Sequence, residues 1–438
     1  MWRLATTKAV ILWVLLVGGG AARASVPEAP WAQGESRPED LSVFLVTFGP
    51  GDEIISWFGH SALVVRDTRL QHERLYNYGM FSFDPTMLAR FATGRLTFWV
   101  GEASVEGSLQ FYREAGRDVR LIELNLPPSA RAGLAKALAE NIRPQNREYL
   151  YHHYFDNCAT RPRDMIDRAV RGALKAAAAT GGRMTLREHT RRHSANSPMM
   201  SVLLDFLMND EIDAKVTPWE EAFLPEELEA QVQRLHWDDG TGQKVPLAKR
   251  TWTYFKATRP QVPDSPPALL PLLGLGGLCL GALSLVLASS RALSERRRQQ
   301  LWGGLNVGVG LVAGLPGTVL FLMSVATNHS VTFWNENLFL ANPLTLLALP
   351  LGWKMMCGSS SAKGRLRWVW YTLSGLSLLG AALKAHPLFN QDNVRLMALL
   401  LPVNLGMAGA FFLDARTKKA VEKTQSGGSH EVSVASGR

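Results

Sequence analysis

The sequence predicts an exported α+β domain followed by an all-α membrane domain of about five transmembrane helices. Three observations predict this organisation. A short apolar run near the N-terminus ends in a small-residue cleavage site, and residues 25–262 mix charged residues with alternating apolar runs and Pro or Gly turns. Residues 263–413, in contrast, are dominated by long apolar stretches. The N-terminal run and residues 25–262 are together typical of an exported soluble domain. The long apolar stretches of residues 263–413 are typical of helices that span a bilayer.

Residues 1–24 have the organisation of a signal peptide. Arg3 and Lys8 precede an apolar run over residues 9–17, and Ala22-Arg23-Ala24 forms a small-x-small cleavage site. The apolar run is shorter than a membrane span, and an uncleaved anchor is the alternative interpretation. In both cases the residues from 25 onward face away from the cytoplasm.

Five apolar stretches predict the membrane spans, at about 268–290, 301–326, 343–357, 368–385 and 394–413. Arginine and lysine gather after the first, third and fifth stretches, whereas the other two loops carry basic residues only at their margins. The positive-inside rule therefore places the basic loops in the cytoplasm and the N-terminal domain outside. Much of the net charge of +9 lies in these loops. Because the chain has neither a basic repeat nor zinc-ligand spacing, no nucleic-acid partner is expected.

The remaining boundaries follow from composition. Residues 25–175 are expected to form the domain that carries the chemistry. Residues 176–262 are expected to be a helical extension and a membrane-interface linker, because prolines punctuate helical sequence and residues 249–256 mix basic with aromatic side chains, as at lipid headgroups. Residues 263–413 form the transmembrane domain, and residues 414–438 are expected to be a disordered cytoplasmic tail.

A β-hairpin is predicted early in the exported domain. His60 opens an alternating run that reaches residue 66, a polar turn follows, and residues 75–79 form a second strand. If the turn is centred near residue 70, His60 lies opposite residues 78–80, close to Asn77 and Tyr78. Further strands are expected at 96–100 and 119–124, and helices from the N-cap Ser129 to about residue 141 and over 160–179.

Cys158 is the cysteine that stands outside the apolar stretches, since Cys279 and Cys357 lie in or beside them. An exported domain with one thiol has no internal disulfide to form, so a nucleophile is the leading interpretation and a small buried residue is the alternative. The helix expected from Thr160 would lower the thiol pKa and offer N–H groups to an oxyanion. Pro162 fits only a first helical turn, so Cys158 either precedes the helix or lies in an irregular first turn.

His60 is the candidate base for this thiol. A histidine on a neighbouring strand can take the thiol proton, and a third polar group can fix the ring tautomer. The alternative for His60 is a histidine that is satisfied at a strand end. The chain has no His-x-x-x-His pair beside a glutamate, no Cys-x-x-Cys and no P-loop, so neither a metal nor another cofactor is expected.

Three segments resemble the bacterial Lnb-type lipoprotein N-acyltransferase family: WFGHSALV (57–64), YNYG (76–79) and DNCATRPRD (156–164). The resemblance extends over most of the chain, including 328–330 and 342–343. The N-terminal part is also similar to circularly permuted papain-like domains, in which the histidine precedes the cysteine. The resemblance therefore implies a periplasmic domain with a permuted papain-like fold, attached to a multi-pass domain in the bacterial inner (cytoplasmic) membrane.

The resemblance also implies an activity. Cys158 would be the nucleophile, His60 the base and Asn77 the third member, with His72 as the second choice for that place. Cys158 would take an acyl chain from a phospholipid as a thioester, and the α-amino group of a diacylglyceryl-cysteine lipoprotein would then attack it. The residues expected to contact substrate are Tyr78, Asn157, Arg161, His329, Asn335 and Asn337.

Several alternatives stay open. The loop 327–342 is expected either to close over the site or to be an interfacial loop whose polar groups cap helix ends. The same Cys158 and His60 pair also fits a papain-like cell-wall peptidase or amidase. It fits a phospholipase or thioesterase equally, if water replaces the amine in the second step. A non-enzymatic sensor or scaffold is a further alternative.

Overall fold

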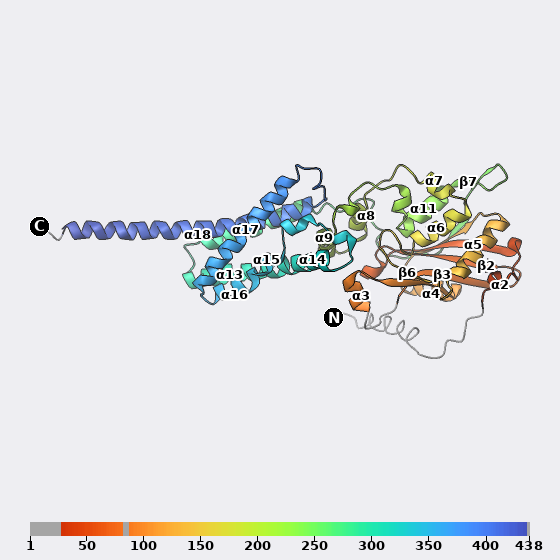
Figure 1. The fold of residues 1–438 in the computed structure, drawn as a ribbon, viewed down its shortest axis with the longest axis horizontal. Helices are drawn as coiled ribbons and strands as arrows, with labels where there is room; N and C mark the ends of the chain where they lie inside the picture. The colour runs from red at the N-terminus through yellow and green to blue at the C-terminus, as the bar shows by residue number, and fades with distance from the viewer. Residues whose placement is uncertain (1–27, 82–86, 436–438) are drawn as a thin grey trace, which may run out of the picture. The chain divides into compact units, whose positions relative to one another are not determined.

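The computed structural model describes residues 28–81 and 87–435, and these residues form two compact units (Figure 1). The first unit contains the chain up to His189 and then Lys215–Asp264. The second contains Thr190–Ala214 and the chain from Ser265 onward. The signal peptide expected over residues 1–24 lies outside the described residues.

An antiparallel sheet of seven strands lies at the centre of the first unit, in the order β6-β4-β3-β2-β1-β5-β9. The strands are β1 (Leu41–Phe48), β2 (His60–Asp67), β3 (His72–Met80), β4 (Thr97–Ala103), β5 (Val119–Leu124), β6 (Glu148–Leu150) and β9 (Ala248–Phe255). A separate small sheet pairs β7 (His236–Asp238) with β8 (Lys244–Pro246). The predicted hairpin is confirmed as β2 and β3. Its register pairs Ala62 with Asn77, which brings His60 to the level of residue 79.

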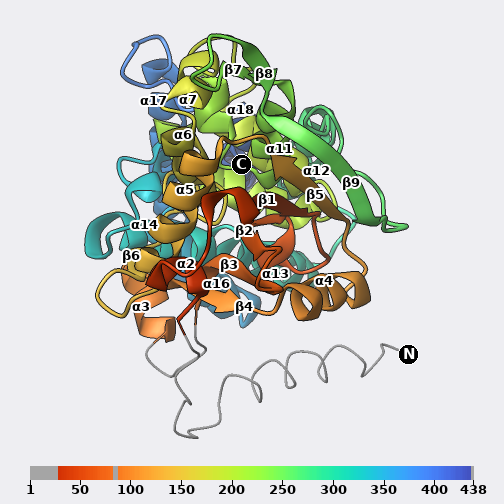
Figure 2. The same ribbon diagram turned by 90° about the vertical axis from the view of Figure 1, so that its right-hand side faces the viewer.

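Helices cover both faces of this sheet (Figure 2). Because successive strand residues point to opposite faces, Leu63 and Ala62 belong to different cores. The Leu63 core packs under α5 (Pro128–Asn141), α6 (Thr160–Ala169) and α11 (Pro225–Arg234), and the Ala62 core packs under α4 (Val105–Glu114). The remaining helices of this part are α2 (Pro30–Gln33), η1 (Pro38–Asp40), η2 (Ile54–Ser56), α3 (Met87–Thr93), α7 (Ala173–Ala177), α8 (Leu186–His193) and α10 (Pro218–Glu221).

The segment 176–262 is helical only up to Arg234, which corrects the expectation that the whole segment is a helical extension. Its last part forms β9, which pairs antiparallel with β5 at the edge of the sheet. Trp252 packs edge-on against Phe44 of β1, with 5.8 Å between ring centroids. Trp252, Tyr254 and Phe255 pack against the Ala62 core, while Lys249 and Arg250 pair with Glu123 of β5, so both kinds of side chain hold this segment as an edge strand.

The second unit is helical. Its long helices are α12 (Leu270–Ser289), α13 (Glu295–Val312), α14 (Gly314–Ala326), α17 (Ser360–Leu383) and α18 (Val394–Ala435). Shorter elements are α9 (Pro198–Leu207), η3 (Asp210–Ile212), η4 (Ser330–Thr332), η5 (Glu336–Phe339), α15 (Pro343–Leu346) and α16 (Ala348–Met356). The structure continues α18 through the tail that was expected to be disordered. Extending an existing helix needs no new nucleation, which accounts for this difference.

Three helical segments among the described residues are long and apolar enough to cross a membrane: Leu270–Ser289, Glu295–Ala326 and Val394–Arg416. A fourth is obtained if Ser330–Phe339 and Pro343–Met356, which are bent by 60°, form one broken span. The sequence predicted about five spans. The fourth predicted stretch is the helix α17, whose first turns carry Lys363, Arg365 and Arg367 and therefore lower its hydropathy.

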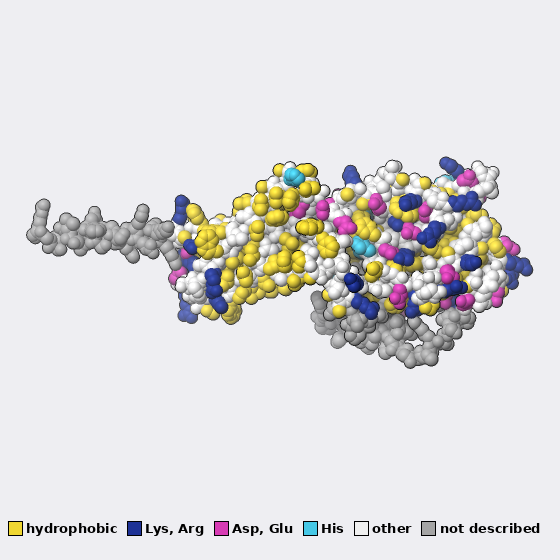
Figure 3. All heavy atoms as spheres, in the orientation of Figure 1, with side chains coloured by type: hydrophobic (Ala, Val, Ile, Leu, Met, Phe, Trp, Pro, Cys, Tyr) yellow, Lys and Arg dark blue, Asp and Glu magenta, His cyan; other side chains and the backbone are white. Residues whose placement is uncertain are grey.

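Glycine and buried amides hold the helices of the second unit together. A Cβ atom on Gly281 of α12 would lie 2.4 Å from the carbonyl oxygen of Pro402 in α18, so the two backbones touch there. The indole N–H of Trp370 donates to Asn306 Oδ1 at 2.6 Å. On the face shown in Figure 3, apolar side chains dominate the surface of this unit. Such packing and such a surface are typical of helices in a bilayer.

Candidate functional site

Cys158 lies on the loop between β6 and α6, two residues before the first residue of that helix. Pro162 falls in the first turn of α6, where a missing N–H is tolerated. Of the two arrangements that the sequence allowed, the structure has the first, with the helix beginning at Thr160 and the cysteine just before it. The thiol is partly buried and belongs to no disulfide.

Asn157 fixes this loop from the inside. Its Oδ1 accepts hydrogen bonds from the backbone N–H groups of Ala159 and Thr160, at 2.8 and 3.0 Å. Its Nδ2 donates to the carbonyl oxygens of His153 and Phe223, at 2.5 and 3.0 Å. The side chain is only 3% exposed. Asn157 therefore positions Cys158 through the backbone, and the expected substrate contact is not supported by this arrangement.

His60 and Asn77 meet across the β2–β3 pair. The ring nitrogen Nε2 of His60 lies 2.6 Å from Asn77 Oδ1. The His60 ring also lies parallel to the rings of Phe48 and Tyr112, with centroid distances of 6.0 and 6.1 Å. The orientation of the imidazole is therefore fixed by the hydrogen bond to Asn77 on the neighbouring strand and by the two parallel aromatic rings.

Gly79 allows the histidine and the cysteine to approach each other. Its φ is +91°, and the register of β3 against β4 shifts between Asn77 and Met80. A Cβ atom on Gly79 would lie 3.4 Å from Cys158 Cβ and 3.7 Å from His60 Cε1. Cys158 and His60 therefore face the same small space, which a larger residue at position 79 would fill.

Electrostatics keep both reacting groups neutral. Burial lowers the pKa of His60 to about 4; the positive charge of Arg117 acts in the same direction, and the hydrogen bond to Asn77 opposes it. Burial raises the pKa of the Cys158 thiol to about 11, although the N–H of Ser61 and the charge of Arg117 favour the thiolate. The expectation that the start of the helix lowers the thiol pKa is therefore wrong, because desolvation outweighs the stabilising groups.

The hydrogen bond to Asn77 also selects the tautomer of His60. Because Asn77 Oδ1 accepts, Nε2 carries the proton and Nδ1 keeps its lone pair. A neutral imidazole of this kind can accept the thiol proton as the sulfur attacks an acyl carbonyl. His60, Asn77 and Cys158, which were predicted to be catalytic, therefore all lie close to the same part of β3, and their catalytic roles stay a prediction.

The other predicted residues of this unit are held by protein groups. Tyr78 is 1% exposed, and its hydroxyl accepts from Asn141 Nδ2 at 2.8 Å. Arg161 pairs with Asp156 and lies 4.1 Å above the Tyr149 ring. His72 begins β3 at the end opposite to Gly79, opposite Asp67. Of these, Tyr78 and His72 do not support the roles expected from the sequence, because one is enclosed in the core and the other lies at the far end of the strand.

The polar residues of the loop 327–342 belong to the second unit. Asn335 Nδ2 donates to the carbonyl oxygen of Leu207, at 3.0 Å, and Asn337 Nδ2 donates to that of Phe206, at 2.9 Å. The backbone carbonyl of His329 accepts from the Thr332 hydroxyl at 2.9 Å. Both asparagines are buried, and they donate to carbonyl groups at the C-terminal end of α9. Of the two interpretations of this loop, these contacts match the one in which its polar groups cap helix ends.

Sequence reasoning missed two residues beside His60. The Tyr112 ring stacks on Phe48 with 3.6 Å between centroids, and the guanidinium of Arg117 lies 4.7 Å from the centroid of the Tyr112 ring. Nothing in the local sequence marks either residue. Only the packing of α4 on the sheet brings them to the site, and that packing depends on long-range contacts.

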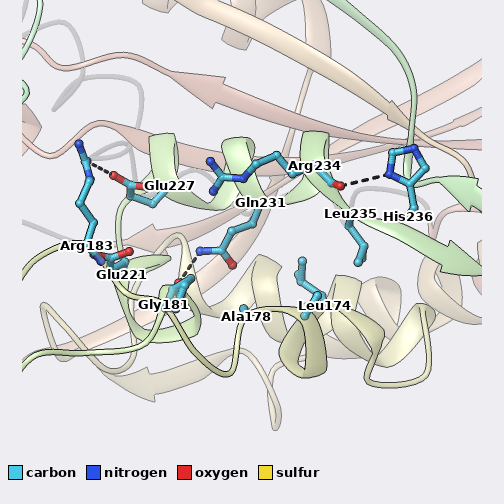
Figure 4. A pocket seen from close by; sticks show the side chains of 12 residues that line it. Leu174, Ala178, Gly181, Arg183, Glu221, Glu227, Gln231, Arg234, Leu235 and His236 are labelled. Carbon is cyan, nitrogen blue, oxygen red and sulfur yellow. Dashed lines mark hydrogen bonds and ion pairs between the residues drawn. The ribbon is translucent and has the colours of Figure 1, made fainter.

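A pocket elsewhere in the first unit contains none of these catalytic candidates (Figure 4). It is lined by α7, α10 and α11, and it contains the ion pair between Arg183 and Glu227. Within residues 28–81 and 87–435, no three His, Cys, Asp or Glu side chains are grouped as metal ligands.

Comparison with known proteins identifies both parts of the chain. Residues 28–192 match the family model of the Lnb N-terminal periplasmic domain, and residues 277–408 match that of the Lnb transmembrane domain. Neither the curated proteins nor the solved structures gave a match. The two family matches follow each other in the order expected from the sequence, so the chain belongs to the Lnb-type family of membrane proteins, with an N-terminal periplasmic domain and a C-terminal transmembrane domain.

Proposed function

We propose that this protein is a membrane-bound, cysteine-dependent acyltransferase. It would move an acyl chain from a phospholipid to the α-amino group of a diacylglyceryl-cysteine at the N-terminus of a lipoprotein. The observation that carries the proposal is the hydrogen bond between His60 and Asn77, on a histidine that faces Cys158 across Gly79. Family membership supports the acyltransferase class.

In the first half-reaction, His60 Nδ1 accepts the thiol proton while Cys158 Sγ attacks the ester carbonyl of the phospholipid. A C–S bond forms, the ester C–O bond breaks, and the proton passes to the departing glyceryl oxygen. At the start of the reaction, two backbone N–H groups are the candidate hydrogen-bond donors to the attacking sulfur. They are those of Ser61 and of Cys158 itself. The products are a lysophospholipid and an acyl-thioester on Cys158.

In the second half-reaction, the neutral α-amino group of the lipoprotein attacks the thioester carbonyl. A C–N bond forms and the C–S bond breaks. His60 takes the proton from the nitrogen and returns it to the sulfur, which restores the neutral pair. Because His60 has a low pKa, its neutral form is available in both halves at neutral pH.

The second unit accounts for how the protein meets substrates that are held in a membrane. Both proposed substrates are held by a bilayer, and the chain supplies apolar helices long enough to cross one. We therefore place the protein in the bacterial cytoplasmic membrane as a multi-pass protein, with the first unit on the periplasmic side. The order His60, Asn77, Cys158 along the chain also fits a circularly permuted papain-like domain.

The proposal is tested in a cell that lacks its own lipoprotein N-acylation. The wild type and Cys158→Ala are expressed there, and a lipoprotein N-terminal peptide is weighed by mass spectrometry. A third acyl chain that depends on Cys158 is the expected result. A peptide that stays diacylated with a folded, membrane-inserted wild type would contradict it, and released fatty acid or cleaved cell-wall peptide would then indicate a phospholipase or a peptidase.

A further inference from the structure

Arg117 is a partly buried cation whose hydrogen-bond donors are only partly used. It follows α4, and its Nε donates to the carbonyl oxygen of Gly49 at 2.7 Å. Among the described residues, neither terminal nitrogen donates a hydrogen bond, and Nη2 is fully buried. No described acidic side chain lies within ion-pair distance of this guanidinium, although Asp52 pairs with the nearby Arg259.

The position of Arg117 relates it to the reacting groups. Its guanidinium covers one edge of the site, 4.7 Å from the centroid of the Tyr112 ring, and the Tyr112 ring lies parallel to that of His60. The charge of Arg117 lowers the pKa of both Cys158 and His60, which favours the thiolate and the neutral imidazole, although burial raises the pKa of Cys158 overall. Arg117 therefore acts on the same space that the nucleophile faces.

A buried guanidinium nitrogen such as Nη2 is unfavourable without a partner, because its N–H groups have lost their hydrogen bonds to water and have no acceptor in the protein. Arg259 does not share this property, since it donates to the carbonyl oxygens of Gly116 and Pro50, at 3.1 and 2.5 Å. Two cations meet here with one exposed carboxylate, so the site has an excess of positive charge. The two terminal nitrogens of Arg117, which donate no hydrogen bond, match the oxygens of a phosphate. A guanidinium can donate two parallel hydrogen bonds to two phosphate oxygens.

The segment that Arg117 holds is amphiphilic. Gly49 begins the loop that leads to His60, and this loop exposes Ile54 and Ile55, which are 45% and 67% exposed. A phosphate-bearing lipid combines an anionic head with apolar chains, and the loop offers a cation and an apolar surface together.

We propose that Arg117 binds the phosphate of the acyl donor while Cys158 attacks the ester, and that it thereby selects phospholipids over neutral acyl glycerides. The inference rests on the proposed transferase function and adds its donor specificity. It concerns only the first half-reaction, because the lysophospholipid carries the phosphate away before the amine attacks.

The test uses the full-length protein in detergent micelles. The rate of acyl-Cys158 formation is measured by intact-protein mass spectrometry with phosphatidylglycerol and with diacylglycerol of the same acyl chains. In Arg117→Gln, kcat/KM for phosphatidylglycerol is expected to fall about 10- to 100-fold, while that for diacylglycerol changes less than about threefold. The matched control is Arg113→Gln, which removes an exposed arginine of α4, the helix that precedes Arg117. Arg117→Lys keeps the charge but not the planar guanidinium. Its kcat/KM for phosphatidylglycerol is expected to lie between those of the wild type and Arg117→Gln.

The outcomes separate the possibilities. An equal loss with both donors would overturn the proposal and make Arg117 a residue that positions His60 or stabilises the thiolate, and no loss would also overturn it. If Arg117→Gln does not fold, the ratio of the two donors in Arg117→Lys decides in the same way. Failure of the wild type to form acyl-Cys158 with either donor would instead contradict the transferase function itself.

Discussion

His60 Nε2 lies 2.6 Å from Asn77 Oδ1, on neighbouring strands whose register pairs Ala62 with Asn77. The bond does two things at once. It leaves Nδ1 as the basic nitrogen, and it holds the ring plane parallel to Phe48 and Tyr112. The orientation of the base thus follows from strand register, which a one-residue slip would destroy.

Removal of this amide is expected to slow catalysis without unfolding the protein. In Asn77→Ala, His60 loses its partner and both tautomers become accessible, so acyl-Cys158 formation should slow about 10- to 100-fold. Mass spectrometry of the acyl-enzyme over time measures this rate. Asn146→Ala, which removes an exposed amide bonded to Glu140, serves as the control. A rate that stays at the wild-type value would show that Asn77 does not orient the base.

The neutral state of the pair predicts an unusual pH dependence. The pKa of Cys158 is raised to about 11, so alkylation of its thiol by iodoacetamide should still rise between about pH 7 and 10. The pKa of His60 is lowered to about 4, so the neutral base is present above that value. Acyl-enzyme formation should therefore be lost only as the pH falls through about 4, and not near the ordinary histidine value of 6.5.

Cys279 and Cys357 are exposed, so this measurement uses a variant with serine at both positions. Alkylation that reaches a plateau below about pH 7 would show a preformed thiolate and imidazolium pair instead. The experiment therefore distinguishes general-base activation from an ion pair.

Gly79 provides a test of the close approach. Gly79→Ala adds a methyl group 3.4 Å from Cys158 Cβ and 3.7 Å from His60 Cε1, at a φ of +91°. The backbone strain should cost about 1–2 kcal/mol of folding free energy, and acyl-Cys158 formation should be lost. Gly172→Ala shares the strain, with a φ of +84°, but meets nothing within 4 Å. Equal activity of the two variants would contradict the shared space between His60 and Cys158.

The sequence predicted the local features of this site and missed those made by long-range packing. Alternation from His60 and the polar turn were enough to predict the hairpin and to bring Asn77 near the imidazole, and Pro162 limited where α6 begins. Arg117 reaches the site only because α4 packs on the sheet. The pairing of β9 with β5 joins residues more than a hundred positions apart, and no local pattern encodes it. The thiol pKa was predicted in the wrong direction because burial cannot be read from a motif.

Asn157 should matter more for stability than for binding. Asn157→Ala leaves the N–H groups of Ala159 and Thr160 and the carbonyl of Phe223 without their partner. A loss of about 1–2 kcal/mol is expected, measured by thermal unfolding in detergent, together with slower acylation of the displaced Cys158. Asn157→Asp keeps the acceptor of the cap and loses the amide donors, so it should lie between wild type and Asn157→Ala. Unchanged unfolding of Asn157→Ala would contradict the capping role.

In the membrane unit, Gly281 is one of several glycines that cannot gain a Cβ atom without a shift of the backbone. A methyl group there would lie 2.4 Å from the carbonyl oxygen of Pro402, so α12 and α18 must separate to admit it. Gly281→Ala is therefore expected to lose about 1–3 kcal/mol in detergent unfolding followed by tryptophan fluorescence. Gly304→Ala on α13 meets nothing within 4 Å, and alanine favours a helix over glycine, so this control should be neutral or slightly stabilised. If both variants unfold alike, the contact between α12 and α18 at Gly281 does not contribute to the stability of this unit.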